Sequence, residues 1–418
     1  MTQLSDDCFA FGGELMTASA ALDLLRSRTV ALPEIEQVPL AEALGRILAA
    51  PLAAARNVPP YDSSAVDGYA VFFDDLAPDA PSPLRVGGRA TAGHPWDGPV
   101  RRGESVRIFT GAPVPQGPDT VLMQEDCEEI PGGAVLIPPG IKRGANLRKA
   151  GEDIPAGAEV LVAGTRMRPQ EIGIAASLGC RMLDVYRPLR VALVSTGDEV
   201  CEPGVELPDG MLYDSNRHVL RALLAGLGCQ VTDLGILPDR METIRDALGR
   251  ASRDHDLIVT SGGMSTGDED HVKAAVEAQG ALHFWRLAIK PGRPVALGQI
   301  GRVPFLGLPG NPVAVMVTFL TLARPLLLRL SGALDRDPLS FPVAVGFAYE
   351  KRAGRREYIR VRLLRGQQGQ VLEKLPRDGA GILTSMVEAD GLAVVAEEVT
   401  ALEPGQTVEF IPFGELIG

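Results

Sequence analysis

The sequence predicts a multidomain α/β and β fold: a discontinuous helical domain with a β-rich insertion, an α/β domain with a mostly parallel sheet, and a C-terminal β-barrel. Three observations support this prediction. The 418 residues exceed the size at which a single hydrophobic core stops growing. Clusters of Gly and Pro separate segments of different hydrophobic periodicity. From Arg190 onward, apolar strand-like runs alternate with helical segments, as in a parallel sheet covered by helices.

The composition excludes several classes of protein. A formal net charge of -12 argues against a broad nucleic-acid or anionic-membrane surface, because such surfaces need clustered Lys and Arg. No apolar run reaches the ~18 residues of a membrane span, and the acidic N-terminus does not resemble a signal peptide. The five cysteines form no C-x-x-C pair, so we expect reduced thiols and a cytoplasmic location. An anionic ligand would need a site that is locally basic or metal-assisted.

The predicted helical domain comprises residues 14–56 and 151–188. Leu and Ile recur three and four residues apart in ALDLLRSRT and PLAEALGRILA, which predicts two short amphipathic helices. A third helix, PQEIGIAASLG, begins at Pro169 and ends at Gly179, and we expect it to pack with the first two. Between these parts, at residues 57–150, short alternating runs such as ESVRIF and DTVLMQED predict the β-rich insertion.

The α/β domain is predicted at residues 189–332 and the β-barrel at 333–418. VALVST, DLIVTSGG and VPFLGLPG have the composition of buried parallel strands, and HVLRALLAGLG is a helical segment between them. A long apolar helix is expected from Asn311 and Pro312 to about Gly332, interrupted at Pro325. After it, short strands separated by RAGRR, RGQQGQ and RDGAG predict the barrel.

Two glycine-rich segments follow predicted strands of the α/β domain. Ser261, Gly262 and Gly263 end a strand, and their backbone N–H groups could approach an anion closely. The alternative is a tight turn with an acidic first helical turn. The second segment, FLGLPGNP, contains Pro309 and Pro312 and could also be an ordinary helix start. Ligands of open α/β sheets bind at such strand ends.

Charged residues lie near these turns in the sequence. Glu199 follows the strand VALVST and could hold Mg²⁺, or it could belong to a solvated acidic turn. If HFWRLAI is a strand, Arg286 and Lys290 share one face and could meet one oxyanion; Arg293 follows in the same segment. A solvated sheet edge is the alternative.

Polar turns in the predicted insertion and just after it are less specific. PPYDSSAVDGYAV contains Asp67, RIFTGAPVP contains Thr110, and RKAGEDIP contains Asp153. Each could be a turn former and nothing more. The histidines show no metal-binding or Ser-His-Asp spacing.

In order, PPYDSSAVDGYAV, FTGAPVP, AGEDI, VSTGDE, YDSN, GILPDR, TSGGMSTGDED, IKPGRP and LPGNP resemble the molybdopterin molybdenumtransferase family, which includes the E domain of gephyrin. The resemblance covers residues 14–418. It implies a molybdopterin-binding α/β domain and a homodimer whose active cleft is shared between subunits. It also implies the reaction of adenylylated molybdopterin with molybdate, assisted by Mg²⁺, to give molybdenum cofactor and AMP. Molybdopterin adenylyltransferase is a further implied partner.

The resemblance also implies roles for individual residues. Catalytic roles fall on Asp67, Thr110, Asp153, Glu199 and Asp239. Ser261, Gly262 and Gly263 would cradle the pterin or its phosphate, Arg286, Lys290 and Arg293 would hold oxyanions, and Pro309 and Pro312 match the family's rigid turn. Asp239, Asp268 and Asp270 would hold the cation, and Asp67 and Thr110 would enter the cleft from the partner subunit.

Two other functions are compatible with parts of the sequence. A molybdopterin adenylyltransferase would share the α/β domain and its Ser-Gly-Gly turn but would lack the other units. A scaffold like gephyrin would bind receptor tails through its dimer, but the chain has neither the long linker nor the adenylyltransferase domain that accompanies that role.

Overall fold

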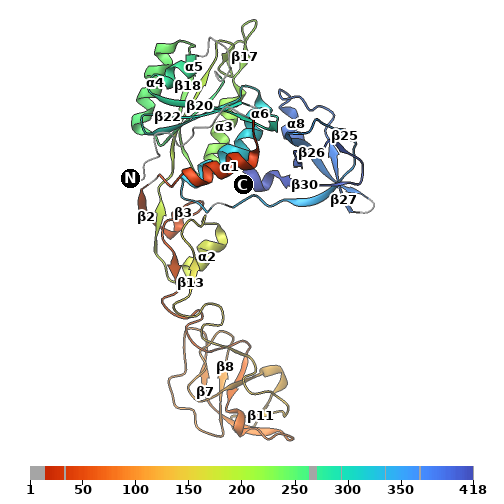
Figure 1. Ribbon diagram of the computed structural model, residues 1–418. Coiled ribbons are helices and arrows are strands. Elements are labelled where there is room, and N and C mark those ends of the chain that lie inside the picture. The colour runs from red at the N-terminus through yellow and green to blue at the C-terminus, as the bar shows by residue number, and fades with distance from the viewer. Residues whose placement is uncertain are drawn as a thin grey trace. The chain divides into compact units, whose positions relative to one another are not determined.

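The computed structural model describes residues 15–32, 34–262, 271–292, 294–334, 336–366 and 369–417, in two compact units. The first unit contains the α/β sheet and the C-terminal barrel, and it comprises Met1–Ala50, Ala163–Arg168 and Met182–Gly418. The second unit comprises Pro51–Val162 and Pro169–Arg181. Each unit is described by itself below (Figure 1).

A seven-stranded sheet forms the centre of the first unit. Its order is β1 (Leu15–Met16), β20 (Gly280–Leu287), β22 (Pro294–Ile300), β23 (Val303–Leu308), β19 (Leu257–Ser261), β15 (Arg190–Thr196) and β18 (Gln230–Leu237). Among these strands only β22 is antiparallel to its neighbours. The predicted mostly parallel sheet is therefore confirmed. All five residues of β19 are buried, as expected for a strand covered on both faces.

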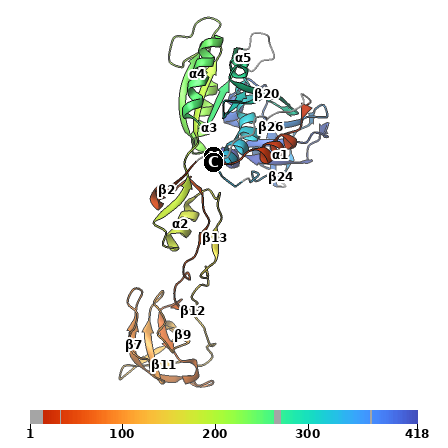
Figure 2. The same cartoon turned by 60° about the vertical axis from the view of Figure 1, so that its left-hand side comes forward.

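Helices cover both faces of this sheet (Figure 2). Val191 and Leu193 of β15 pack in a core with α1 (Ala18–Arg28), α3 (Ser215–Gly226), α6 (Pro312–Thr318) and α7 (Arg324–Leu330). Ala192 and Val194 pack in a second core with α4 (Met241–Asp254) and α5 (His271–Glu277). Successive residues of a strand point to opposite faces, so one apolar strand supplies both cores.

The helix that runs from Pro312 to Leu330 is the one described helix that is long and apolar enough to cross a membrane. However, 67% of its apolar window is buried inside the unit, so it is a core helix. A π-helical segment, η4 (Phe319–Ala323), separates α6 from α7 directly before Pro325. Proline lacks an N–H group and crowds the carbonyl of the preceding turn, which explains the predicted interruption at this position.

The C-terminal strands close into a barrel. β26 (Arg356–Gly366), β27 (Gly369–Lys374), β24 (Phe341–Val345), β30 (Thr407–Pro412) and β28 (Gly391–Val395) pair in this order, and β28 pairs back to β26. The predicted C-terminal barrel is thus confirmed. β21 (Ile289–Lys290) also pairs with β26. The chain therefore passes from the α/β sheet to a strand of the barrel immediately after β20. β25 (Tyr349–Glu350), β29 (Ala401–Leu402), α8 (Thr384–Glu388) and α9 (Phe413–Ile417) complete this part.

The predicted helical domain is not confirmed. Residues 39–49, expected to be a helix, form the end of β2 (Ile35–Pro39), the short η1 (Leu40–Glu42) and β3 (Ile47–Leu48). β14 (Met182–Tyr186) pairs with both β2 and β3, and this long-range pairing overrides the local helical pattern. Gly45, at φ +76°, makes the turn between them.

The expected packing of α2 (Pro169–Ser177) with the first helix is also wrong. α1 packs in the α/β core of the first unit, through Ala18, Ala21 and Leu25. α2 belongs to the second unit, where Ile174 packs near Ala54 and Ile154. The two helices have similar amphipathic patterns, and a pattern does not specify which core an apolar face joins.

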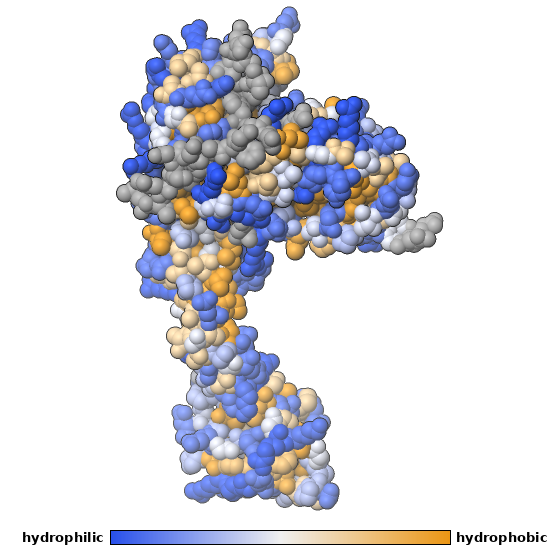
Figure 3. Space-filling model, in the orientation of Figure 1, coloured by the Kyte–Doolittle hydropathy of each residue, from blue (hydrophilic) through white to orange (hydrophobic). Residues whose placement is uncertain are grey.

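The second unit contains a six-stranded sheet and several two-stranded pairs. The sheet order is β10 (Glu128–Ile130), β11 (Ala134–Ile137), β7 (Ser82–Ala90), β8 (Glu104–Ile108), β6 (Gly68–Val71) and β9 (Thr120–Met123). β5 (Ser63–Ser64) pairs with β12 (Leu147–Arg148), and β4 (Leu52–Ala53) with β13 (Glu159–Leu161). The six-stranded sheet and the pair β5–β12 lie within the predicted insertion of residues 57–150, whereas β4 and β13 lie in the stretches predicted for the helical domain. On the visible faces of both units, apolar residues are interspersed among hydrophilic ones (Figure 3).

Candidate functional site

Two strands of the α/β sheet, β15 and β19, end side by side in glycine turns. Thr196 is followed by Gly197 and Ser261 by Gly262. Gly262 has φ +86°, and a Cβ atom there would lie 2.9 Å from the carbonyl oxygen of Thr196. Only glycine fits both the backbone conformation and this close approach. The predicted glycine-rich turn at the carboxyl edge of the sheet is therefore present up to Gly262.

Polar side chains connect this turn to the Pro309–Gly310 turn. The Ser261 hydroxyl donates to the Pro309 carbonyl at 3.2 Å, and the Asn216 side-chain amide donates to Ser261 Oγ at 3.0 Å and to the Gly310 carbonyl at 2.6 Å. Asn216 lies in the first turn of α3, whose N-cap is Asp214. The motif YDSN thus caps a helix and joins the two glycine-containing turns.

Several buried polar atoms at this edge have no hydrogen-bond partner within the described part of the chain. They are Ser195 Oγ, Thr196 Oγ1, Thr260 Oγ1 and Asn216 Oδ1. Buried polar groups without partners are uncommon in folded proteins, and a bound ligand is one explanation for them.

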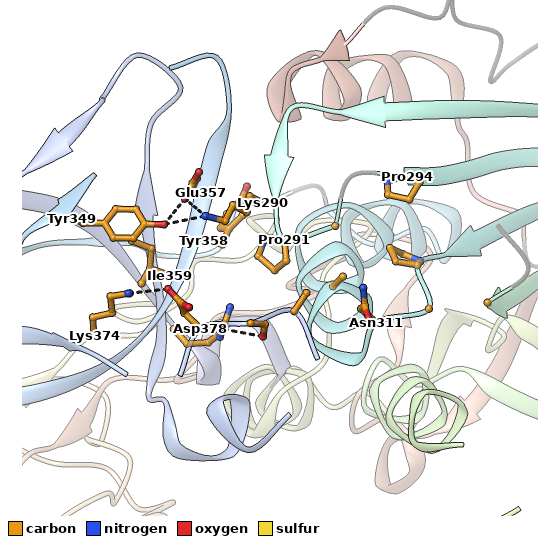
Figure 4. Close-up of a pocket in the computed structure, with 18 of the residues that line it drawn as sticks. Lys290, Pro291, Pro294, Asn311, Tyr349, Glu357, Tyr358, Ile359, Lys374 and Asp378 are labelled. Atoms are coloured by element: carbon orange, nitrogen blue, oxygen red, sulfur yellow. Dashed lines mark hydrogen bonds and ion pairs between the residues drawn. The ribbon is translucent and has the colours of Figure 1, made fainter. Parts of the chain in front are cut away.

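A cavity of about 650 Å³ lies between this edge and the barrel (Figure 4). Glu199, Gly262, Pro309 and Asn311 line it from the α/β side, and Lys290 of β21 lines it where the chain joins the barrel sheet. The barrel contributes Tyr349, Glu357, Arg360, Lys374 and Asp378, among others. The first core extends across this boundary, because it includes Tyr358, Met386 and Leu392 of the barrel. Both walls of the cavity therefore belong to one compact unit.

Lys290 is held at the cavity by two side chains of the barrel. Its ammonium group lies 3.1 Å from Glu357 Oε2 and 3.3 Å from the Tyr349 hydroxyl. That hydroxyl donates to Glu357 Oε2 at 2.5 Å. Burial, together with the hydrogen bond to Glu357, raises the pKa of Tyr349, so the phenol stays protonated at neutral pH. The buried Glu357 carboxylate thus neutralises the charge of Lys290.

A second ion pair, between Lys374 and Asp378, lies on the same barrel wall. The two groups are 2.8 Å apart, and the hydrogen bond from Lys374 lowers the pKa of Asp378. Asp378 therefore stays ionised at neutral pH and offsets the charge of Lys374, so this pair also adds no net charge to the cavity.

Arg360 differs from the other cations that line the cavity. It is 4% exposed, its Nε donates to Ser385 Oγ at 3.0 Å, and one terminal nitrogen donates to the Gly379 carbonyl at 3.4 Å. Within the described residues no carboxylate forms an ion pair with it, and burial lowers its pKa. A guanidinium stays charged even when its pKa falls, and the charge of Asp378 acts on Arg360 without forming an ion pair, so a buried cation with no directly paired carboxylate lines this cavity. The arrangement is suited to an oxyanion.

The structure brings some predicted residues to the cavity and leaves others away from it. Glu199, Gly262, Lys290 and Pro309 line it; Ser261 contacts Pro309, and Pro312 begins α6 beside Asn311. Asp239 lies at the end of β18, where its backbone N–H donates to Asp198 Oδ1 at 3.3 Å. Gly263, Asp268, Asp270 and Arg293 lie outside the described residues.

The expectation that Arg286 and Lys290 share one strand face is wrong. Arg286 is in β20, paired with Leu15 and Pro294 of the α/β sheet, whereas Lys290 is in β21, paired with Glu357 of the barrel. The chain leaves one sheet for another between them, so a spacing of four residues no longer means a common face. Arg286 does not line the described cavity.

The barrel residues were missed by sequence reasoning. Tyr349, Glu357 and Arg360 come from a domain whose strands gave no chemical motif. One signal was present: in EYIRV, Glu357 and Arg360 are charged residues within a strand whose neighbours are buried. Charged residues in such a strand are rare unless they are paired or functional.

The second unit brings Asp67 and Thr110 together. The Thr110 backbone N–H and hydroxyl each donate to Asp67 Oδ1 at 2.8 Å. These bonds, first from the backbone and then from the hydroxyl, lower the pKa of Asp67, so the carboxylate is ionised at neutral pH. Asp153 is exposed on a different loop, where its backbone N–H donates to the Val58 carbonyl at 3.2 Å.

Comparison with known proteins identifies the relatives of this chain. Residues 16–179 match the MoeA N-terminal region (domain I and II), 192–329 a probable molybdopterin binding domain, and 342–413 the MoeA C-terminal region (domain IV). The chain is 37% identical over 403 residues to the molybdopterin molybdenumtransferase of Haemophilus influenzae, covering 95% of this chain and 99% of that protein. It is 32% identical over 342 residues to gephyrin of Dictyostelium discoideum, covering 72% of this chain and 47% of gephyrin.

A solved structure agrees with these sequence matches. The crystal structure of the molybdopterin biosynthesis MoeA protein from Pyrococcus horikoshii OT3 superposes with a TM-score of 0.82 at 27% identity, covering 96% of this chain and 100% of that chain. The matched regions span both units and the cavity described above. The chain belongs to the molybdopterin molybdenumtransferase family.

Proposed function

We propose that this chain transfers molybdenum from molybdate to adenylylated molybdopterin, releasing AMP and forming molybdenum cofactor. The observation that carries the proposal is the cavity in which the buried Arg360 forms no ion pair with a carboxylate in the described part of the chain and faces the same space as Lys290. A tetrahedral oxyanion would supply a directly bonded anion for this guanidinium. The Gly262 and Pro309 turns, which line the same cavity, are where a pterin or its phosphate would lie.

The described side chains suggest a division of labour. Arg360 and Lys290 would bind and orient molybdate, with Glu357 and Tyr349 holding the Lys290 ammonium in place. Ser261 and Gly262 would approach the pterin side of the second substrate. Glu199 lines the cavity at the same edge of the sheet and would act as a catalytic carboxylate. Binding both reactants in one cavity would replace a bimolecular encounter by an oriented reaction.

The reaction is tested by mixing the purified protein with adenylylated molybdopterin and molybdate and measuring AMP. Release of AMP that depends on molybdate is expected. AMP release at the same rate without molybdate, or none with it, would contradict the transferase reaction. Formation of adenylylated molybdopterin from molybdopterin and ATP would instead indicate an adenylyltransferase.

We further propose a requirement for Mg²⁺, which would neutralise charge on the phosphoanhydride. Asp239 is the one described member of the proposed ligand set Asp239, Asp268 and Asp270, and no three potential ligands converge within the described residues. The described part therefore does not make a complete cation site, and the requirement rests on the family resemblance. Chelation with EDTA should abolish AMP release and added Mg²⁺ should restore it; full activity in EDTA would contradict the requirement.

We also propose that the chain is a cytoplasmic homodimer in which Asp67 and Thr110 complete the partner's active cleft. Asp67→Ala and Glu199→Ala would then each be inactive alone, although both form dimers. Mixed by subunit exchange, they should regain activity in about one quarter of the sites, because half of the dimers are hybrids with one intact cleft. Hybrids without activity would contradict a shared cleft.

A further inference from the structure

Two arginines lie directly opposite each other on neighbouring parallel strands of the second unit. In the register of β7 with β8, Arg89 is opposite Arg107. Four residues earlier on β7, Arg85 is opposite Glu104, which is the expected pairing of opposite charges. Like charges directly across a sheet are destabilising, so the Arg89–Arg107 pair breaks a local rule of sheet stability. Such exceptions concentrate at functional sites.

A β-bulge produces this pairing. Val86 is opposite Ser105 and Gly88 is opposite Val106, so Gly87 is an extra residue in β7. Without the extra residue, Arg89 would be opposite Ile108 rather than Arg107. Bulges are common near active sites, where they redirect a side chain.

The two guanidinium groups stack on one aromatic ring. Their central carbons lie 4.8 Å (Arg89) and 4.6 Å (Arg107) from the centroid of the Phe109 ring. Arg107 is fixed further, because it donates to the Gly68 carbonyl at 2.9 Å and to the Gln124 side chain. Arg89 is exposed and has no hydrogen bond or ion pair within the described residues. Its N–H groups are thus available to a ligand, while the ring contact limits its freedom.

The Arg89–Arg107 pair lies next to the hydrogen-bonded contact between Asp67 and Thr110. Phe109 directly precedes Thr110, which donates to Asp67, and Gly68, held by Arg107, directly follows Asp67. The pair therefore places positive charge beside a proposed catalytic carboxylate, in a chain whose net charge is -12. A phosphate bound at Arg89 would also offset the repulsion between the two guanidinium groups.

We propose that Arg89 is a substrate-binding residue that contacts a phosphate oxygen of a pyrophosphate-containing substrate. The inference rests on the proposed function, in which the second substrate is an adenylylated pterin. The Phe109 ring orients the Arg89 guanidinium, and the planar fork of Arg suits two phosphate oxygens.

The test uses the full chain and compares Arg89→Ala with Arg85→Ala, a matched exposed arginine on the same strand. Arg89→Ala should raise the KM for adenylylated molybdopterin by about 10- to 100-fold, with the KM for molybdate unchanged. Arg89→Lys should restore part of the loss. The urea midpoint of Arg89→Ala should equal or exceed that of the wild type, because a repulsion is removed; a residue with a purely structural role would lower it.

A binding measurement separates this inference from the proposed reaction. Titration with inorganic pyrophosphate should show weaker binding to Arg89→Ala than to Arg85→Ala and wild type. If wild type releases no AMP but this difference in binding is seen, the transferase reaction is contradicted and the anion site stands. Equal pyrophosphate binding and equal KM in the two variants would overturn the assignment of Arg89.

Discussion

Replacing Arg360 by Met should weaken molybdate binding far more than it weakens the fold. Methionine has a similar length and no charge, so it fills the buried position without offering a donor to an oxyanion. A hydrogen bond from a charged group contributes about 1.5 to 3 kcal/mol, which corresponds to an increase of about 10- to 150-fold in the KM for molybdate. The KM for adenylylated molybdopterin should change little, because Arg360 belongs to the barrel wall.

The effect on stability is expected to be small for a structural reason. The variant loses the bonds to Ser385 Oγ and to the Gly379 carbonyl, but Ser385 still donates to the Ile382 carbonyl at 2.6 Å. It also loses a buried charge that burial disfavours. We expect the free energy of unfolding to fall by about 2 kcal/mol or less.

The assay is AMP release measured against molybdate concentration, together with urea unfolding. Arg362→Met is the matched control, because Arg362 lies two residues further along β26 and pairs with Glu388 at 2.7 Å outside the cavity. If Arg360→Met folds poorly, Arg360→Lys can be measured instead, because it keeps the positive charge and removes only the guanidinium fork. A KM for molybdate equal to that of Arg362→Met, in a folded Arg360→Met protein, would refute the assignment of Arg360 to the oxyanion.

Three further outcomes follow from described contacts. Burial alone would raise the pKa of Asp256, but hydrogen bonds from Arg187 and Arg190 lower it to about 2. The ionised Asp256 should therefore add about 2 kcal/mol to the free energy of unfolding above pH ~4, and this stabilisation should be lost as the pH falls toward 2. Urea midpoints of wild type and Asp256→Asn should therefore differ at pH 7 and converge in acid; a gap independent of pH would contradict this. Gly262→Ala should lower AMP release strongly. Gly210→Ala should not, because Gly210 also has a positive φ but its added Cβ would have no atom within 4 Å. Equal activities of the two variants would show that the close approach of residue 262 to the Thr196 carbonyl is unimportant. Tyr349→Phe should raise the KM for molybdate by a few-fold, because Lys290 loses one of its two polar contacts but keeps Glu357; an unchanged KM would remove Tyr349 from the positioning of Lys290.

Much of the α/β domain was predictable because its signals are local. The apolar runs of β15, β19 and β23, each followed by a glycine or proline turn, specify buried parallel strands whose ends meet at one edge. The interruption before Pro325 follows from the chemistry of one residue. For the same reason the sequence alone predicts a common site for Gly262 and Pro309, which both follow the ends of strands.

The failures occurred where long-range pairing overrode a local pattern. Residues 39–49 have helical spacing, yet both ends of this stretch pair with β14 as strands, and only the short η1 and a turn lie between them. Arg286 and Lys290 have strand spacing, yet the chain changes sheet between them. A periodicity describes one segment, and it contains no information about which partner will supply the hydrogen bonds.

The sequence by itself determined the alternation of strands and helices, the turns at the sheet edge and, through the order of its motifs, the family. Only the tertiary structure decided which charges face the cavity. Glu357 neutralises Lys290, Asp378 pairs with Lys374, and Arg360 forms no ion pair with a carboxylate in the described part of the chain. The net charge of a site depends on distances between side chains, and those distances arise only when the barrel closes and packs against the sheet.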